Sequence, residues 1–175
     1  MMRLAVWLLV LLGMGGCSPF QRTGTAPPDF RVVSDVPFYR QDGTYDCGPA
    51  ALASLLAHKG HPIAPDHIRE QVYSPVLRGS LLPDMENYAR QQGLATRSGR
   101  GDLDLLRRQI DAGRPVLIPL EMGWKAASAP HYIVVFGYTD AAFLVHAGEK
   151  QSVFIAADQL LPRWEKLNRL YLYLE

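Results

Sequence analysis

Residues 41–59 read QDGTYDCGPAALASLLAHK, a polar turn followed by an almost uninterrupted apolar run. The composition of this run predicts a helix from Gly48 to Lys59, which Gly60 ends. Because the helix is apolar on nearly every side, we expect it to be buried among other elements. Cys47 stands directly before it, so the sequence predicts a cysteine at the N-terminus of a buried helix.

This placement of Cys47 indicates nucleophilic chemistry. A helix N-terminus carries free N–H groups and a partial positive charge, which lower the pKa of a thiol. Gln41 lies six residues earlier, and a loop of that length lets its amide face an oxyanion beside the sulfur, with the backbone N–H of Cys47 as second donor. A nucleophilic cysteine also needs a base, for which we expect His131, because it opens a long apolar strand at a loop–strand junction.

The overall composition excludes several classes of protein. The chain has 175 residues, of which 48% are hydrophobic and 20% charged, so it is neither disordered nor collagen-like and suits one domain. The net charge of +1 gives no indication of nucleic-acid binding. Two cysteines are too few for a disulfide scaffold or a four-cysteine zinc site. A metal site built from Cys47, His131 and His146 lacks any short ligand spacing, so we expect no metal and no cofactor.

The N-terminus has the parts of an export signal. Arg3 is followed by the nine apolar residues 4–12, which as a helix rise only about 14 Å, roughly half of a bilayer core. Residues 14–17, Met-Gly-Gly-Cys, resemble a bacterial lipobox, in which cleavage leaves a lipid-modified cysteine as the first residue. This resemblance implies lipidation of Cys17, and Ser18 after it implies sorting to the outer membrane.

Three segments follow from this interpretation. Residues 1–16 are a lipoprotein signal peptide, and residues 17–31 are the lipidated cysteine with a flexible tether rich in Pro, Thr and Gly. Residues 32–175 form the domain.

The rest of the domain predicts helices first and an antiparallel sheet second, which is an α+β order. Besides the helix from Gly48 to Lys59, the predicted helices are 65–73, 81–92 with Ser80 as N-cap, 102–112 and 156–164. The predicted strands are 32–39, 115–120, 131–138, 143–146, 151–155 and 170–174.

Three pieces of the sequence carry a family resemblance. They are Gln41 with residues 46–52 (DCGPAAL), residues 113–118 (GRPVLI) and residues 131–138 (HYIVVFGY). In this order and separation they resemble the papain-like cysteine peptidases, and among these the bacteriocin-processing, double-glycine leader peptidases, over residues 36–165. The resemblance implies a papain-like fold in which N-terminal helices, including the nucleophile helix, pack on a C-terminal antiparallel sheet that carries the histidine.

The resemblance also implies roles for individual residues. Cys47 is the nucleophile, His131 the base and Gln41 the oxyanion donor. The family places an Asp or Asn about 15 residues after the histidine to orient its ring, whereas this chain has His146 there. An imidazole at His146 is a weaker partner than a carboxylate, and Asp158 is an alternative orienting group.

The sequence therefore predicts a lipid-anchored cysteine peptidase that hydrolyses peptide bonds of peptide or protein substrates in the bacterial envelope. Membrane attachment is expected through the lipid. Two alternatives stay open. The presence of His146 in place of the family's Asp or Asn favours a catalytically weak or inactive module that binds peptides or proteins. The same thioester also supports acyl transfer or transpeptidation when an amine replaces water.

Overall fold

The structure is a computed structural model that describes residues 20–22, 29–123 and 130–175. The helices are α1 (Cys47–His58), α2 (Pro65–Val72), α3 (Leu82–Gln91), α4 (Leu103–Asp111) and α5 (Ala157–Glu165). The strands are β1 (Phe20–Arg22), β2 (Arg31–Val32), β3 (Tyr73–Ser74), β4 (Gly79–Ser80), β5 (Thr96–Arg100), β6 (Val116–Glu121), β7 (Pro130–Tyr138), β8 (Ala142–Ala147), β9 (Lys150–Ala156) and β10 (Leu170–Leu174).

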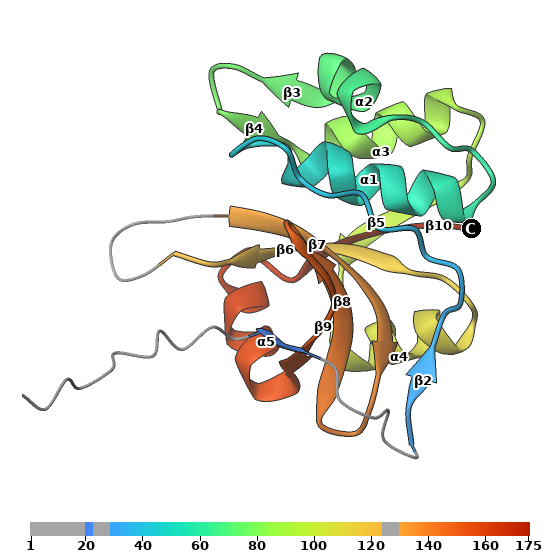
Figure 1. The fold of residues 1–175 in the computed structure, drawn as a ribbon, viewed down its shortest axis with the longest axis vertical. Coiled ribbons are helices and arrows are strands. Elements are labelled where there is room, and N and C mark those ends of the chain that lie inside the picture. Colours follow the sequence, from blue (N-terminus) through green and yellow to red (C-terminus); the bar gives the residue numbers. More distant parts are fainter. Residues whose placement is uncertain (1–19, 23–28, 124–129) are drawn as a thin grey trace, which may run out of the picture.

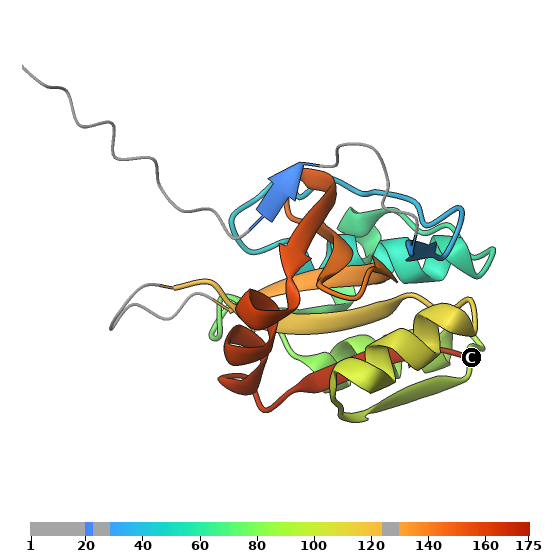
Figure 2. The ribbon, with the colours of Figure 1, turned by 90° about the horizontal axis from the view of Figure 1, so that it is seen from below.

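One antiparallel sheet organises the described part of the chain. Its strand order is β1-β9-β8-β7-β6-β10-β5, and β2 pairs with β7, while β3 and β4 form a separate hairpin. The helices α1, α2 and α3 cover one face of the sheet, and α4 and α5 cover the other (Figure 1, Figure 2). The predicted α+β arrangement, with the helix of Cys47 packed on an antiparallel sheet, is confirmed.

The two helical layers create two hydrophobic cores, because alternate residues of a strand face opposite sides of a sheet. On β6, Ile118 packs in the core with α4 and α5, whereas Leu117 packs in the core with α1 to α3. On β7, Ile133 and Val134 divide in the same way. Strands buried on both faces have continuous apolar sequences, which is why β6 and β7 are predictable.

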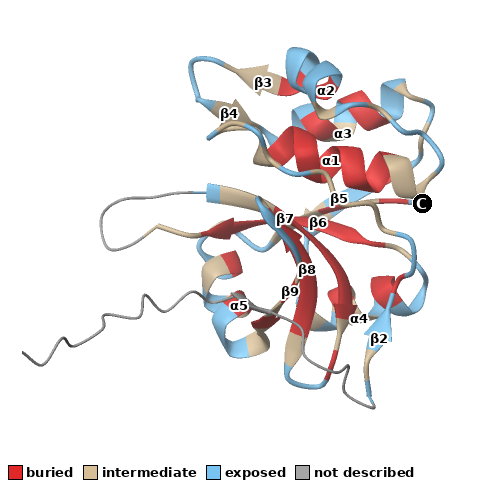
Figure 3. Cartoon of the chain, viewed as in Figure 1, coloured by how far each residue is buried: buried red, intermediate tan, exposed pale blue. Residues whose placement is uncertain are grey.

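The helix α1 lies at the centre of one core, with every residue from Gly48 to Leu56 buried (Figure 3). Its small residues let neighbouring elements approach closely. A Cβ added to Gly48 would lie 3.0 Å from Cβ of Ser80 and 3.2 Å from Sδ of Met85. The hairpin strand β4 and the helix α3 therefore pack directly on the first turn of α1, beside Cys47.

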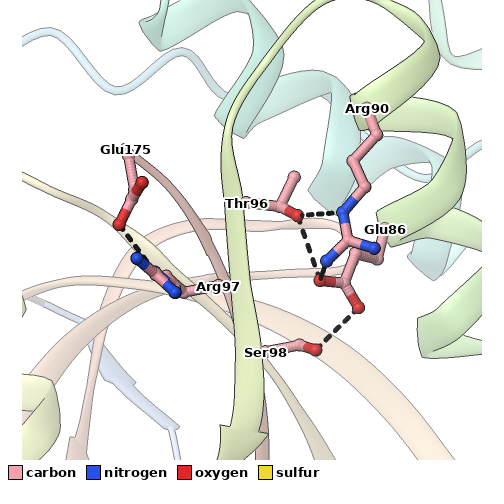
Figure 4. A network of polar contacts seen from close by, with 6 residues as sticks. All are labelled: Glu86, Arg90, Thr96, Arg97, Ser98 and Glu175. Carbon is pink, nitrogen blue, oxygen red and sulfur yellow. Dashed lines mark hydrogen bonds and ion pairs between the residues drawn. The ribbon is translucent and has the colours of Figure 1, made fainter.

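A carboxylate fixes α3 to the edge strand β5 (Figure 4). Oε1 of Glu86 accepts hydrogen bonds from Arg90 at 2.6 Å and from Thr96 at 3.0 Å, and its Oε2 accepts one from Ser98 at 2.6 Å. Arg90 also donates to the Thr96 hydroxyl at 2.8 Å. This network joins the helical layer to the outermost strand of the sheet.

Two local predictions are wrong. The predicted strand 32–39 is reduced to β2, because the chain leaves the sheet after Val33 to reach α1, and Pro37 has no N–H for a ladder bond. Ser80 is not the N-cap of α3. Leu81 takes that position without a side-chain cap, and Ser80 pairs with Tyr73 in β4.

Most of the features predicted for the N-terminus fall outside the residues that the structure describes. The signal peptide and Cys17 belong to the part that the structure does not describe. Within the stretch expected as a tether, Phe20–Arg22 forms β1 and pairs with β9. Across residues 20–22, 29–123 and 130–175, no helix is long and apolar enough to cross a bilayer.

Candidate active site

Cys47 is the first residue of α1 and is half-buried. Burial raises the pKa of its thiol, and the neighbouring Asp46 carboxylate acts in the same direction. Backbone hydrogen bonds from Tyr132, Gly48 and Cys47 itself lower this pKa, as expected at a helix N-terminus, but by less. The predicted lowering of the Cys47 pKa is therefore wrong for the protein without substrate, because desolvation outweighs the helix end.

The carboxylate beside the nucleophile is paired with a cation. Asp46 makes no side-chain capping bond to α1, and its Oδ1 lies 2.8 Å from Nε of Arg69 on α2. The Arg69 guanidinium also lies over the ring of Tyr73, 4.8 Å from its centroid. This pairing reduces the negative charge that a thiolate at Cys47 would face.

His131 lies near the start of β7, opposite Leu120 of β6. Burial lowers the pKa of its imidazole, so the ring is neutral near pH 7. A neutral imidazole suits a general base, which takes the proton of a thiol as the sulfur attacks.

Gly148 brings Gln41 and His131 together. A Cβ at Gly148 would lie 3.1 Å from both Cε1 and Nε2 of His131 and 3.3 Å from Oε1 of Gln41. The backbone N–H of Gln41 also donates to the carbonyl of Gly148 at 3.2 Å. The glycine therefore lies against both side chains, and its missing side chain is what lets them converge.

Cys47 belongs to the same neighbourhood. Its sulfur receives the backbone hydrogen bond of Tyr132, the residue next to His131. A small cavity between α1 and the sheet is lined by Cys47, Tyr132 and Gly148 together. Residues next to Cys47, His131 and Gln41 therefore meet at one end of the interface between α1 and β7.

The amide of Gln41 is engaged within its own loop, where Nε2 donates to the carbonyl of Gly43. Each amide nitrogen carries two N–H groups, so one contact does not exhaust its capacity to donate. Gln41 lies against Gly148, as His131 does, and its amide bonds its own loop, so its role as oxyanion donor stays a prediction.

His146 does not contact His131 through its ring nitrogens. Its Nε2 lies 3.1 Å from the carbonyl oxygen of Val36, and its Nδ1 accepts the backbone N–H of Ser152 at 3.1 Å. In the sheet it pairs with Val134. Both nitrogens are therefore used elsewhere. Asp158 lies in the first turn of α5, on the face of the sheet opposite α1.

A pocket of about 590 Å³ opens beside the sulfur. Cys47 lines it together with residues of the β3–β4 hairpin and of β7. Its lining includes Tyr45, Leu77, Arg78, Ser80, Leu81, Tyr132 and Leu170. The pocket is large enough for several side chains of a peptide, and it places an extended apolar wall next to the candidate nucleophile.

The sequence does not reveal the contact that two residues of this pocket, Tyr132 and Ser80, make with each other. The Tyr132 hydroxyl donates to the carbonyl of Ser80 at 3.2 Å and so joins β7 to the hairpin. The Ser80 hydroxyl is buried and has no hydrogen-bond partner among the described residues. The sequence predicts Ser80 only as the N-cap of a helix. No signal in the sequence points to the hairpin, since its strands have two residues each.

The described residues contain no group of three His, Cys, Asp or Glu side chains arranged to hold a metal ion.

The sequence matches a known protein family. The model of the peptidase C39-like family matches residues 33–170, which is most of the chain. A curated relative, the colicin V secretion/processing ATP-binding protein CvaB of Escherichia coli, is 25% identical over 132 residues. That stretch is 75% of this chain, but this chain spans only 17% of the length of CvaB.

Solved structures share the fold. A C39-like peptidase chain from Bacillus anthracis matches with a TM-score of 0.70 at 14% identity, covering 83% of this chain and 97% of the other. The peptidase domain of Streptococcus ComA, a bifunctional ABC transporter, matches at 0.67 with 23% identity, covering 80% and 98%. A double glycine motif protease from an AMS/PCAT transporter, solved with its leader peptide, matches at 0.63 with 19% identity, covering 82% and 94%.

Proposed function

Because this chain belongs to the peptidase C39-like family, we propose that it is a cysteine peptidase that hydrolyses peptide bonds through a thioester on Cys47. One observation carries the proposal. The only cysteine among the described residues begins a buried helix, receives the backbone hydrogen bond of Tyr132 next to His131, and opens on a pocket of about 590 Å³.

The proposed reaction begins with His131 neutral and the Cys47 thiol protonated. Neutral His131 takes the thiol proton as the sulfur of Cys47 attacks the carbonyl carbon of a peptide, and the carbonyl oxygen becomes an oxyanion. The backbone N–H of Cys47 and the amide of Gln41 donate to this oxyanion. Protonated His131 then gives its proton to the leaving amine, and water hydrolyses the thioester.

The test is cleavage of a proteome-derived peptide library, read by mass spectrometry. We expect the wild-type protein to produce new termini and a transient adduct on Cys47, and Cys47→Ala to produce neither. An added peptide amine distinguishes hydrolysis from transfer, because an acyltransferase gives ligated products. Equal turnover by the Cys47→Ala variant would overturn the mechanism.

A second candidate function is a peptide-binding module without catalysis. Two observations favour it: burial raises the pKa of Cys47, and both ring nitrogens of His146 are bonded away from His131. Binding of library peptides by the wild-type protein, with no cleavage and no adduct, would select this function over the first.

The protease solved with a leader peptide supports a peptide as substrate class, and a Gly-Gly peptide is a suitable first probe. We also propose that residues 1–16 are a signal peptide and that Cys17 carries lipid which holds the domain in the bacterial envelope at the outer membrane. The support is the Met-Gly-Gly-Cys sequence at residues 14–17. Incorporation of an alkyne-labelled fatty acid, abolished by Cys17→Ser, tests this proposal.

A further inference from the structure

The hydrogen bonds of His146 define its protonation state. The backbone N–H of Ser152 donates to Nδ1 at 3.1 Å, so Nδ1 carries no proton. In a neutral ring the proton is then on Nε2, which donates to the carbonyl oxygen of Val36 at 3.1 Å. The ring therefore accepts on one side and donates on the other, and these roles cannot be exchanged.

The acceptor side satisfies a local irregularity of the sheet. The register between β8 and β9 shifts between Val145 and Ala147, and Ser152 has a positive φ of 50°. A backbone N–H at such a bulge is left without a ladder partner. Nδ1 of His146 supplies that partner.

The donor side holds the segment that leads to the active site. The carbonyl of Val36 is bonded to His146, and the backbone N–H of Gln41 is bonded to the carbonyl of Gly148 at 3.2 Å. Residues 36–41 are thus attached at both ends to residues 146–148 at the end of β8. The ring of Phe38, within this segment, packs on His146 with centroids 5.2 Å apart.

The attachment bears on the candidate catalytic groups. Gln41 ends the attached segment, and Gly148 lies against both Gln41 and His131. His146 is 5% exposed and is covered by Phe136 on another side, with centroids 4.2 Å apart. Its place in the core is therefore fixed, and a change there is transmitted to the backbone that presents Gln41.

We propose that His146 is a positioning residue that holds the segment of Gln41 through the carbonyl of Val36, and that it does not orient His131. This inference rests on the proposed peptidase function. The family resemblance implies a carboxylate at this position, which would accept hydrogen bonds. The role proposed for His146 is different, because it needs a hydrogen-bond donor.

Two substitutions separate the two sides of the ring. The amide nitrogen of His146→Gln reaches the place of Nε2 and keeps a donor for Val36. The amide oxygen of His146→Asn reaches the place of Nδ1 and keeps only the acceptor for Ser152. His146→Asp introduces the carboxylate that an orienting role for His131 would require. His67→Gln, at an exposed position on α2, is the matched control.

The experiment measures kcat, KM and thermal stability of each variant with the best-cleaved library peptide. We expect His146→Gln to keep kcat within about threefold, and His146→Asn to lose about 30-fold or more in kcat because Gln41 is displaced. His146→Asp should lose activity as well, since its side chain, like that of Asn, reaches only the Ser152 N–H and supplies no donor for the carbonyl of Val36. Nitrogen-15 shifts of the ring should report the Nε2–H tautomer.

The contrary results are distinct. Equal losses of kcat in His146→Gln and His146→Asn, following their losses of stability, would make the residue merely structural and overturn the inference. An active His146→Asp would assign the position to orienting His131 and overturn it too. A wild-type protein that cleaves no library peptide would instead overturn the peptidase proposal itself.

Discussion

The imidazole of His131 lies against the Cα of Gly148, so closely that a Cβ there would be 3.1 Å from two ring atoms. Gly148 has a φ of +60°, in the left-handed region, and belongs to the turn between β8 and β9. The same glycine accepts the backbone hydrogen bond of Gln41. This turn therefore sets the distance between the candidate base and the candidate oxyanion donor.

Gly148→Ala is expected to reduce kcat about 100-fold, because the added methyl group displaces the ring of His131 and the amide of Gln41. The left-handed backbone also costs about 1–2 kcal/mol of stability for any residue with a Cβ. Gly93→Ala is the matched control. Gly93 has a φ of +82°, and its added Cβ meets nothing within 4 Å. Gly148→Ala should lose at least as much stability as Gly93→Ala, and only Gly148→Ala should lose activity.

Alkylation of Cys47 by iodoacetamide should accelerate with pH. Burial raises the thiol pKa above its ordinary value of about 9.0, so the thiolate becomes abundant only in the alkaline range. We expect the rate, measured by mass spectrometry, to rise from pH 6 to pH 9 without levelling off. A rate at pH 6 that already equals the rate at pH 9 would indicate a preformed ion pair with His131 and contradict this account.

The sequence predicts the fold well where elements are long and periodic. Leu103, Leu106 and Ile110 stand at helical spacing and so predict α4, and Asp102 caps it by accepting the Leu105 N–H at 2.6 Å. The strand β5 reads Thr-Arg-Ser-Gly-Arg, which has no apolar alternation, because it is an edge strand whose side chains mostly face solvent. Its place is decided by pairing with β10 and by the Glu86 network, which are tertiary contacts.

The candidate site likewise has residues that the sequence predicts and properties that it does not. Cys47 and His131 are identifiable because each stands at the start of an apolar element. The pKa of Cys47 is not predictable from that pattern, since it depends on how tightly β7 covers the sulfur. The roles of His146 and Tyr132 depend on contacts with Val36 and Ser80, which lie far away in the sequence, so no local spacing reveals them.

Stability should fall as the pH decreases below about 6.5, the ordinary pKa of histidine in an unfolded chain. Burial lowers the pKa of both His131 and His146 in the folded protein. Between the unfolded and folded values, the unfolded chain therefore binds more protons, and acid favours unfolding. We expect urea titrations at pH 7.5 and pH 5.5 to show this loss, and His146→Gln to reduce its size. An equal loss in that variant would mean that His146 does not contribute.

Removing the hydroxyl of Ser80 should not destabilise the protein. This hydroxyl is buried and has no partner among the described residues, and a buried donor without a partner costs free energy. Ser80→Ala should therefore leave the free energy of unfolding unchanged or raise it by up to about 1 kcal/mol. Ser98→Ala is the contrast, because Ser98 donates to Glu86 at 2.6 Å, and we expect that variant to lose about 1 kcal/mol. If urea unfolding shows Ser80→Ala to be the less stable of the two, the Ser80 hydroxyl makes a stabilising hydrogen bond in solution, which would contradict this prediction.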